Sequence, residues 1–230
     1  MVPRLVLTDI EGTTTAIAFV HATLFPFVAQ ALPEFLALHQ NVPEVAAVLD
    51  QVRAAEPAQA PLETLRRWMA ADAKVTPLKT LQGIMWRHGY ADGRLRGHLW
   101  PDVAPALRAW HAAGTRLAVY SSGSEEAQRL LFGFSEAGDL VPLFERFFDT
   151  RIGLKREAES YNHIAIGLGV PPSDILFLSD VAEELDAATL AGMRGCQLVR
   201  AQDGTRPSGR HPQAATFSQV AQIFALQQPA

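Results

Sequence analysis

The chain has 230 residues, of which 48% are hydrophobic and 19% charged, and its formal net charge at pH 7 is −4. This length can bury one hydrophobic core, or one core together with an inserted unit. The acidic balance offers no extended positive surface to nucleic acid or to an anionic membrane, so we expect neither as a partner.

A short apolar run at residues 5–7 predicts a buried strand, and DIEGTTT follows it at 9–15. Asp9 and Glu11 must lie just past the end of this strand, because a buried strand does not tolerate an unpaired charge. One interpretation is a plain turn in which Gly12 has a positive φ, and the other is a carboxylate site that binds a metal. The two acids interrupt the apolar run too early for a signal peptide, and no run approaches the length of a membrane span.

The stretch from about Phe19 to Gly89 has helical hydrophobic spacing and no predicted strand. Prolines at 26, 33, 43, 57, 61 and 77 predict several short helices rather than a few long ones. Each of three apolar faces repeats at helical spacing: Val45, Val48, Leu49 and Val52; Leu62, Leu65, Trp68 and Met69; Leu78, Leu81, Ile84 and Met85.

From residue 102 onward, predicted strands and helices alternate. Helices are expected from 103 to about 113, after Ser124, over 161–168 and over 182–192, and strands at 115–120, 146–149, 175–180 and 196–199. The last strand contains the single cysteine, Cys196, which we expect to be buried and which excludes an intrachain disulfide, as is typical of a reducing cytoplasm. Residues 200–215 predict a polar loop, and the chain then closes with a short amphipathic helix.

Apolar strands that alternate with helices predict a parallel sheet covered on both faces. The expected fold class is therefore α/β, with a doubly wound, Rossmann-like core and an all-helical cap inserted after the first strand. We expect residues 1–15 and 100–230 to form the catalytic core and residues 16–99 to form the cap domain. In such sheets, ligands bind beyond the carboxyl ends of the strands.

Polar residues follow the strands at those ends: Ser121 and Ser122 after the second, Lys155 after the third and Asp180 after the fourth. Taken singly, each has a structural interpretation as a turn former, a solvated lysine or a helix cap. Glu184, one helical turn beyond Asp180, could be a surface acid or a residue that steadies a metal ligand.

Taken together, these residues indicate phosphoryl transfer. A carboxylate such as Asp9 can attack phosphorus once the phosphate charge is neutralised, and oxygen ligands from Asp9 and Asp180 would suit Mg²⁺. Lys155 can neutralise the remaining charge, and serine hydroxyls with backbone amides at a helix start can hold phosphoryl oxygens. A second carboxylate, Glu11, can protonate the leaving oxygen and then activate water.

The four motifs DIEGT, YSSGS, Lys155 and FLSDVAEE resemble those of the haloacid dehalogenase-like hydrolase superfamily. Within it, longer stretches resemble the acireductone synthase family, the bifunctional enolase-phosphatases of methionine salvage: LTDIEGTTTAIAFV, LQGIMWRHGY, VYSSGSEEAQRLLFG and FFDTRIGLKREAESY. This similarity extends over essentially the whole chain. It implies a Mg²⁺-dependent reaction in which 5-methylthio-2,3-dioxopentyl phosphate is enolised and then dephosphorylated to the acireductone.

The resemblance also implies roles for the site residues. It makes Asp9, Glu11 and Asp180 the ligands of one Mg²⁺ per subunit, with Asp9 as the nucleophile and Lys155, Ser121 and Ser122 as substrate contacts. Phosphatases of the wider superfamily carry aspartate where this chain has Glu11, so the sequence leaves open whether Glu11 binds metal through its side chain or its backbone. It also leaves the enolisation base unassigned.

Two alternatives stay open: a capped phosphatase that acts on another small phosphate ester, and a non-catalytic binding module. The stretch 85–100 interleaves arginines, histidines and aromatics, as a nucleic-acid groove could, but the acidic balance favours a hinge next to the cap. We expect a cytoplasmic monomer with a small-molecule phosphate ester as its partner and with no nucleic acid or membrane partner.

Overall fold

The computed structural model describes residues 2–229. The chain divides into two compact units, one made of the residues up to Ala18 together with those from Arg96 onward, and the other of Phe19–Leu95. The expected cap bounds, 16–99, lie a few residues outside the second unit.

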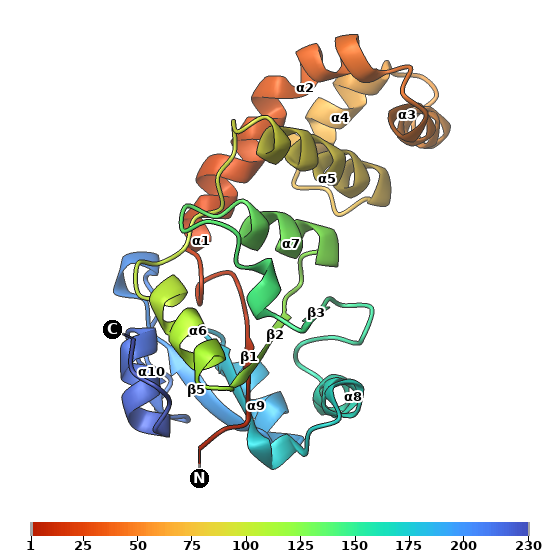
Figure 1. The fold of residues 1–230 in the computed structure, drawn as a ribbon. Helices are drawn as coiled ribbons and strands as arrows, with labels where there is room; N and C mark the ends of the chain where they lie inside the picture. Colours follow the sequence, from red (N-terminus) through yellow and green to blue (C-terminus); the bar gives the residue numbers. More distant parts are fainter. Residues whose placement is uncertain (1, 230) are drawn as a thin grey trace. The chain divides into compact units, whose positions relative to one another are not determined.

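The first unit is built on a parallel sheet of six strands in the order β3-β2-β1-β4-β5-β6 (Figure 1). The predicted α/β class with a doubly wound sheet is confirmed, and the order reverses at β1; in sheets of this kind, ligands bind at the carboxyl ends of the strands next to that reversal. The short strand β6 was not predicted, because it lies in the stretch that was expected to be a polar loop. The strands are β1 (Leu5–Thr8), β2 (Arg116–Tyr120), β3 (Arg146–Phe148), β4 (Ile175–Ser179), β5 (Arg194–Leu198) and β6 (Gln213–Ala214).

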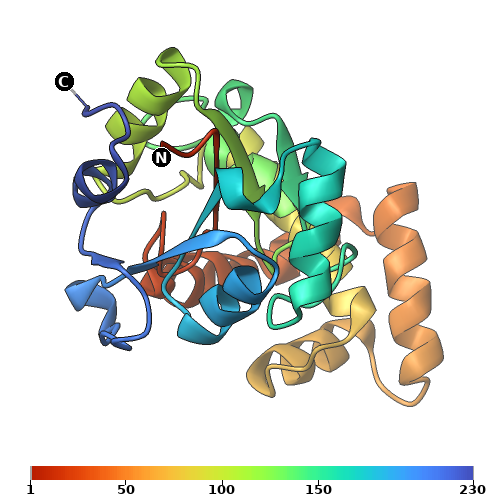
Figure 2. The ribbon, with the colours of Figure 1, turned by 90° about the horizontal axis from the view of Figure 1, so that it is seen from below.

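Helices cover both faces of this sheet (Figure 2). On one face α6 (Val103–Ala112) packs against α10 (Phe217–Phe224), and on the other α8 (Ala158–Leu168) packs against α9 (Ala182–Leu190). The helix α7 (Glu125–Gly133) follows β2, and single 3-10 turns lie at η2 (Val141–Leu143), η3 (Pro172–Asp174) and η4 (Ala201–Asp203).

The strands are apolar because both of their faces are buried. Leu5, Leu7 and Phe177 are fully buried in the core that α8 and α9 cover. Cys196 in β5 is free and fully buried, as predicted, and burial raises the pKa of its thiol to about 12.

The second unit is all helical, as predicted for the insert. A continuous helical stretch made of α1 (Ile17–Phe19), the π-helical η1 and α2 enters this unit at Phe19, the last residue of α1. Three further helices follow in the same unit. Their apolar faces meet in one core that includes Val48, Leu65 and Leu81. These elements are η1 (Val20–Leu24), α2 (Phe25–His39), α3 (Pro43–Ala55), α4 (Pro61–Ala70) and α5 (Thr76–Ala91).

The prolines act in two ways. Each of α3, α4 and α5 begins with a proline in its first turn, where no intrahelical amide is needed. The prediction that prolines divide the whole region into short helices is wrong for the first stretch, since Pro33 lies inside α2. Its neighbours Leu32 and Leu36 are buried in the core of the unit, and this packing outweighs the lost backbone bond.

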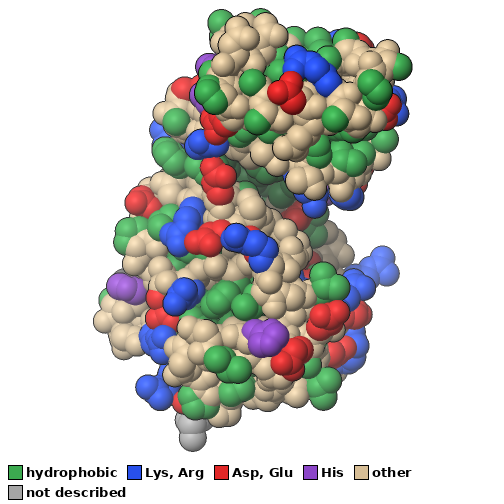
Figure 3. All heavy atoms as spheres, turned by 90° about the vertical axis from the view of Figure 1, so that its right-hand side faces the viewer, with side chains coloured by type: hydrophobic (Ala, Val, Ile, Leu, Met, Phe, Trp, Pro, Cys, Tyr) green, Lys and Arg blue, Asp and Glu red, His purple; other side chains and the backbone are tan. Residues whose placement is uncertain are grey.

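The helical stretch Ile17–His39 is also long and apolar enough to cross a membrane, with a mean hydropathy of 1.2, which differs from the expectation that no run approaches that length. One such helix is weak evidence for a membrane span, because a core helix of a globular unit meets the same criterion of length and hydropathy. Val28 and Leu32 belong to the buried core of the insert. On the face shown in Figure 3, acidic and basic side chains are interspersed.

Candidate active site

The parallel register brings the ends of the three central strands side by side. Thr8, the last residue of β1, pairs with Val119 of β2 on one side and with Leu178 of β4 on the other. Asp9 therefore lies level with the last residues of those two strands, Tyr120 and Ser179. The sequence predicted polar residues at these ends, and the sheet order is what makes them neighbours.

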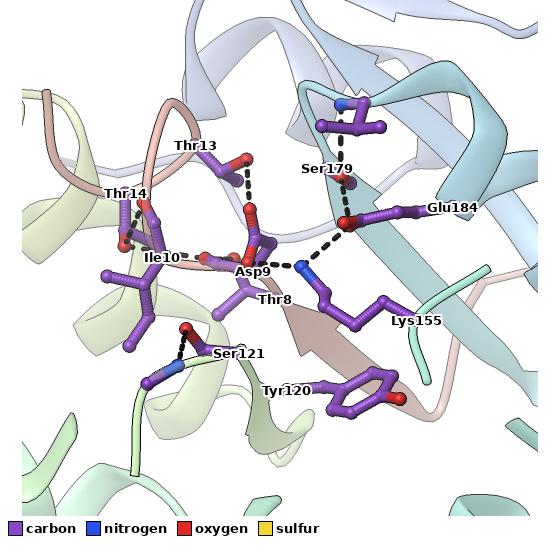
Figure 4. Close-up of polar contacts among 12 residues, drawn as sticks. Thr8, Asp9, Ile10, Thr13, Thr14, Tyr120, Ser121, Lys155, Ser179 and Glu184 are labelled. Atoms are coloured by element: carbon purple, nitrogen blue, oxygen red, sulfur yellow. Dashed lines mark hydrogen bonds and ion pairs between the residues drawn. The ribbon is translucent and has the colours of Figure 1, made fainter. Parts of the chain in front are cut away.

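A buried lysine joins two carboxylates at this edge (Figure 4). Lys155 Nζ lies 2.6 Å from Asp9 Oδ1 and 2.6 Å from Glu184 Oε2, and the three residues are 8%, 4% and 9% exposed. Ser179 donates a 2.8 Å hydrogen bond to the same Glu184 oxygen. Burial by itself lowers the pKa of the Lys155 ammonium, but the charges of Asp9 and Glu184 outweigh it and raise that pKa, so Lys155 stays protonated.

Negative charge exceeds positive charge in this cluster of side chains. The half-buried Asp180 has its pKa raised to about 7 by burial and then by the charges of Asp9 and Glu184. Burial and the Asp9 charge also raise the pKa of Glu184. Three carboxylates thus share the one ammonium of Lys155, which would leave a formal charge of about −2 if all were ionised.

The loop after β1 turns sharply beside Asp180. Gly12 has φ +75°, and a Cβ at this position would lie 2.4 Å from Asp180 Oδ2. Only glycine fits here, because a side chain would meet both an unfavourable backbone conformation and the carboxylate. The Asp180 carboxylate consequently packs directly on the backbone next to Glu11.

The three threonines of the motif stabilise the same loop. Thr13, Thr14 and Thr15 are fully buried, and their amides donate to the Ile10 carbonyl at 3.2, 2.8 and 3.0 Å. The Thr13 hydroxyl points to Asp9 Oδ2 in a long contact of 3.5 Å (Figure 4). These contacts explain why the motif contains three threonines. The sequence analysis assigned them no role.

Serines and a helix start lie at the end of β2. The buried Ser121 accepts a hydrogen bond from the Gly123 amide at 3.2 Å, while Ser122 is exposed. The helix α7 begins after Ser124, as predicted, and Ser124 caps it by accepting a hydrogen bond from the Ala127 amide. With Glu125 and Glu126 in its first turn, α7 begins directly after these serines.

Two tyrosines hold the loop that carries Lys155, and sequence reasoning missed both. The Tyr161 hydroxyl donates to the Lys155 carbonyl at 2.7 Å, and the Tyr120 hydroxyl donates to the Gly153 carbonyl at 2.9 Å. In the sequence both tyrosines are ordinary apolar positions of a helix and a strand. Only the packing of α8 against β2 gives them this function.

Not every predicted residue is brought into the buried cluster. Glu11 is exposed, in contrast to Asp9, Lys155 and Glu184. Among residues 2–229, no three His, Cys, Asp or Glu side chains are grouped so that they could hold a metal ion by themselves. In the stretch 85–100, His98 Nδ1 lies 2.9 Å from Thr15 Oγ1 and so contacts the last threonine of the motif.

The donor chemistry nonetheless fits a hard divalent cation. The Asp9 and Asp180 carboxylates are oxygen donors, the excess negative charge around them needs a cation, and Asp180 packs on a backbone segment whose carbonyls are further oxygen donors. Residues with this chemistry can bind a phosphate ester, neutralise it and attack it.

Three comparisons with known proteins bear on this site. A family model described as haloacid dehalogenase-like hydrolase matches residues 3–192. The chain is 57% identical over 228 residues, 99% of both chains, to a protein named enolase-phosphatase E1 from Granulibacter bethesdensis, and 54% identical over 228 residues, 99% of this chain and 98% of the relative, to one of the same name from Acidiphilium cryptum. The crystal structure of the UTR4 protein of Saccharomyces cerevisiae superposes with a TM-score of 0.81 at 32% identity and covers 93% of this chain and 98% of its own.

Proposed function

Because the chain belongs to the enolase-phosphatase E1 family of haloacid dehalogenase-like hydrolases, we propose that it converts 5-methylthio-2,3-dioxopentyl phosphate to the acireductone and phosphate in methionine salvage, with Mg²⁺. The reaction would enolise the diketone and then remove its phosphoryl group. The observation that carries the proposal is the buried contact of 2.6 Å between Lys155 and Asp9 at the carboxyl end of β1.

Asp9 is the proposed nucleophile. One of its carboxylate oxygens attacks phosphorus, the bond from phosphorus to the enol oxygen breaks, and an aspartyl-phosphate forms. Lys155 lies against Asp9 and offsets the charge of the phosphoryl oxygens, and Glu184 holds the ammonium in place.

Glu11 is the proposed general acid and base. Its exposed carboxylate would protonate the leaving enol oxygen, then remove a proton from the water that hydrolyses the aspartyl-phosphate. The glutamate side chain is longer by one methylene than the aspartate of related phosphatases, which increases its reach.

The metal ligands we propose are the Asp9 and Asp180 carboxylates and the backbone carbonyl of Glu11, for one Mg²⁺ per subunit. The close approach of Asp180 to Gly12 supports the backbone assignment for Glu11. When bound, Mg²⁺ supplies positive charge to the phosphoryl oxygens and aligns them with the nucleophile.

The phosphate is expected to bind where β2 ends. The hydroxyls of Ser121 and Ser122 and the backbone amides at the start of α7 are donors suited to phosphoryl oxygens. In this assignment residues 1–15 and 100–230 form the catalytic core and residues 16–99 a cap domain. We further propose that the protein is a cytoplasmic monomer.

The test uses synthetic 5-methylthio-2,3-dioxopentyl phosphate with Mg²⁺. Ultraviolet absorbance reports the enol and a coupled assay reports phosphate, for the wild type and for Asp9→Asn. We expect both signals from the wild type and no phosphate from the variant, while any enol that the variant forms would show that Asp9 is not the enolisation base.

Other outcomes would change the assignment. Hydrolysis of simpler phosphate esters, with no turnover of the diketone phosphate, would favour a phosphatase of different specificity. No phosphate from any ester would reject the catalytic assignment and favour a binding module.

A further inference from the structure

Arg200 opens the stretch that the sequence predicted to be a polar loop, yet it is only 3% exposed. Its guanidinium donates to the Thr13 carbonyl twice, from Nε at 3.2 Å and from Nη2 at 3.0 Å. It also pairs with Asp102, with distances of 2.8 Å to Oδ1 and 3.1 Å to Oδ2, and donates to the Ala215 carbonyl at 2.9 Å. An arginine buried with this many partners has a specific geometric function.

Aromatic rings complete the surroundings of the guanidinium. The Trp100 ring centroid lies 5.3 Å from Arg200 Cζ and the Phe217 centroid lies 5.7 Å from it. Asp102 Oδ2 also accepts the Phe217 amide at 2.7 Å, at the start of α10. The guanidinium is therefore fixed by groups from two other parts of the chain, the segment before α6 and the start of α10.

The Thr13 carbonyl belongs to the loop that follows Asp9. Thr13 is fully buried, so its carbonyl would lose its donors inside the protein if Arg200 were shortened. The hydroxyl of the same residue points to Asp9 Oδ2, and the preceding Gly12 packs on Asp180. A shift of Thr13 would thus move the surroundings of both carboxylates.

We infer that Arg200 is a positioning residue for the nucleophile loop: by holding the Thr13 carbonyl, it fixes Asp9 relative to Asp180. This inference rests on the proposed function, since it concerns the same site. Arg200 itself is not expected to touch the substrate.

The alternative is that Arg200 only stabilises the fold through its buried pair with Asp102. Two variants separate these roles because both weaken that pair, one by removing its forked geometry and the other by removing the carboxylate charge. Arg200→Lys loses the forked contact with the Thr13 carbonyl, whereas Asp102→Asn leaves Arg200 in place to donate to it.

The experiment measures phosphate release with Mg²⁺, together with thermal unfolding. For Arg200→Lys we expect kcat to fall roughly 10- to 100-fold while KM changes by less than about threefold, since a displacement of about 1 Å at a reacting group has such an effect. For Asp102→Asn we expect a lower Tm with kcat within about threefold of the wild type.

Arg116→Lys is the matched control. Arg116 also makes a forked contact with a carboxylate, donating to both Glu145 oxygens at 2.7 Å, and it donates to the Leu168 carbonyl at 2.8 Å. It is the first residue of β2 and so lies at the amino ends of the strands, away from the candidate site. We expect its kcat to equal that of the wild type.

Wild-type kcat in Arg200→Lys would overturn the inference, as would equal losses of kcat in Arg200→Lys and Asp102→Asn. If the wild type releases no phosphate, the proposed function fails, and amide hydrogen exchange still tests the positioning. Peptides covering 10–15 should then exchange faster in Arg200→Lys than in Arg116→Lys, and equal rates would reject the role of Arg200.

Discussion

Replacing Lys155 by methionine tests the electrostatics of the site most directly. Methionine keeps much of the length and the apolar stem of lysine but removes the ammonium that lies 2.6 Å from both Asp9 and Glu184. Both carboxylates would then be buried next to each other and to Asp180 without their cation.

The structure sets the expected size of the effect. Removing one member of a buried ion pair costs about 3–5 kcal/mol, and for a chain of this length each kcal/mol lowers Tm by about 2–4 °C, so Tm should fall by roughly 6–20 °C. The kcat for phosphate release should fall about 100- to 1000-fold, as when one charge-stabilising donor is removed from an active site.

Thermal unfolding in EDTA and a phosphate-release assay in Mg²⁺ measure the two effects. The control is Lys74→Met, which removes an ion pair of similar length, 2.7 Å to Asp72, between side chains that are 67% and 74% exposed. We expect no measurable change there, because solvent screens an exposed pair. If Lys155→Met unfolds at the wild-type temperature, the buried carboxylates do not depend on this cation and the reasoning is refuted.

Three further predictions concern other parts of the core. In EDTA, the contribution of Asp180 to stability should be fully present below about pH 4 and should be lost, by up to about 4 kcal/mol, toward pH 7. The reason is that the folded protein keeps a proton on Asp180, whose pKa is raised to about 7, whereas the unfolded chain releases it near 3.8; the difference between the Tm series of the wild type and of Asp180→Asn over this range measures it. Gly12→Ala should lower both Tm and activity, whereas Gly114→Ala, with φ +86° and open space around it, should lower Tm slightly and leave activity unchanged; equal activities would contradict the clash with the carboxylate. Cys196 should resist a thiol reagent until the protein unfolds, since burial raises its thiol pKa to about 12; a rapid reaction of the folded protein would contradict this.

Much of the fold follows from local patterns. The apolar runs at 5–7 and 175–179 predict strands buried on both faces, and the spacing of Val45, Val48 and Val52 predicts one face of α3. Such patterns are readable because burial acts on each residue with the period of its own helix or strand. Pro33 shows the limit, since tertiary packing kept α2 continuous where local propensity predicted a break.

The candidate site was predictable to the extent that its residues follow strand ends. Asp9, Ser121 and Asp180 could be selected because a charge or hydroxyl after an apolar strand lies at the edge where ligands bind. Their proximity required the strand order, which no local pattern encodes.

What the sequence determined by itself is therefore the fold class and the chemical character of the site, because periodicity and strand-end chemistry are local properties. Tertiary structure alone decided which partners the buried groups have. Lys155 and Asp9 are separated by 146 positions, and Arg200 and Thr13 by 187. Contacts at such separations arise from strand order and helix packing, so a lysine and an arginine that the sequence places in polar loops become buried and paired in the fold.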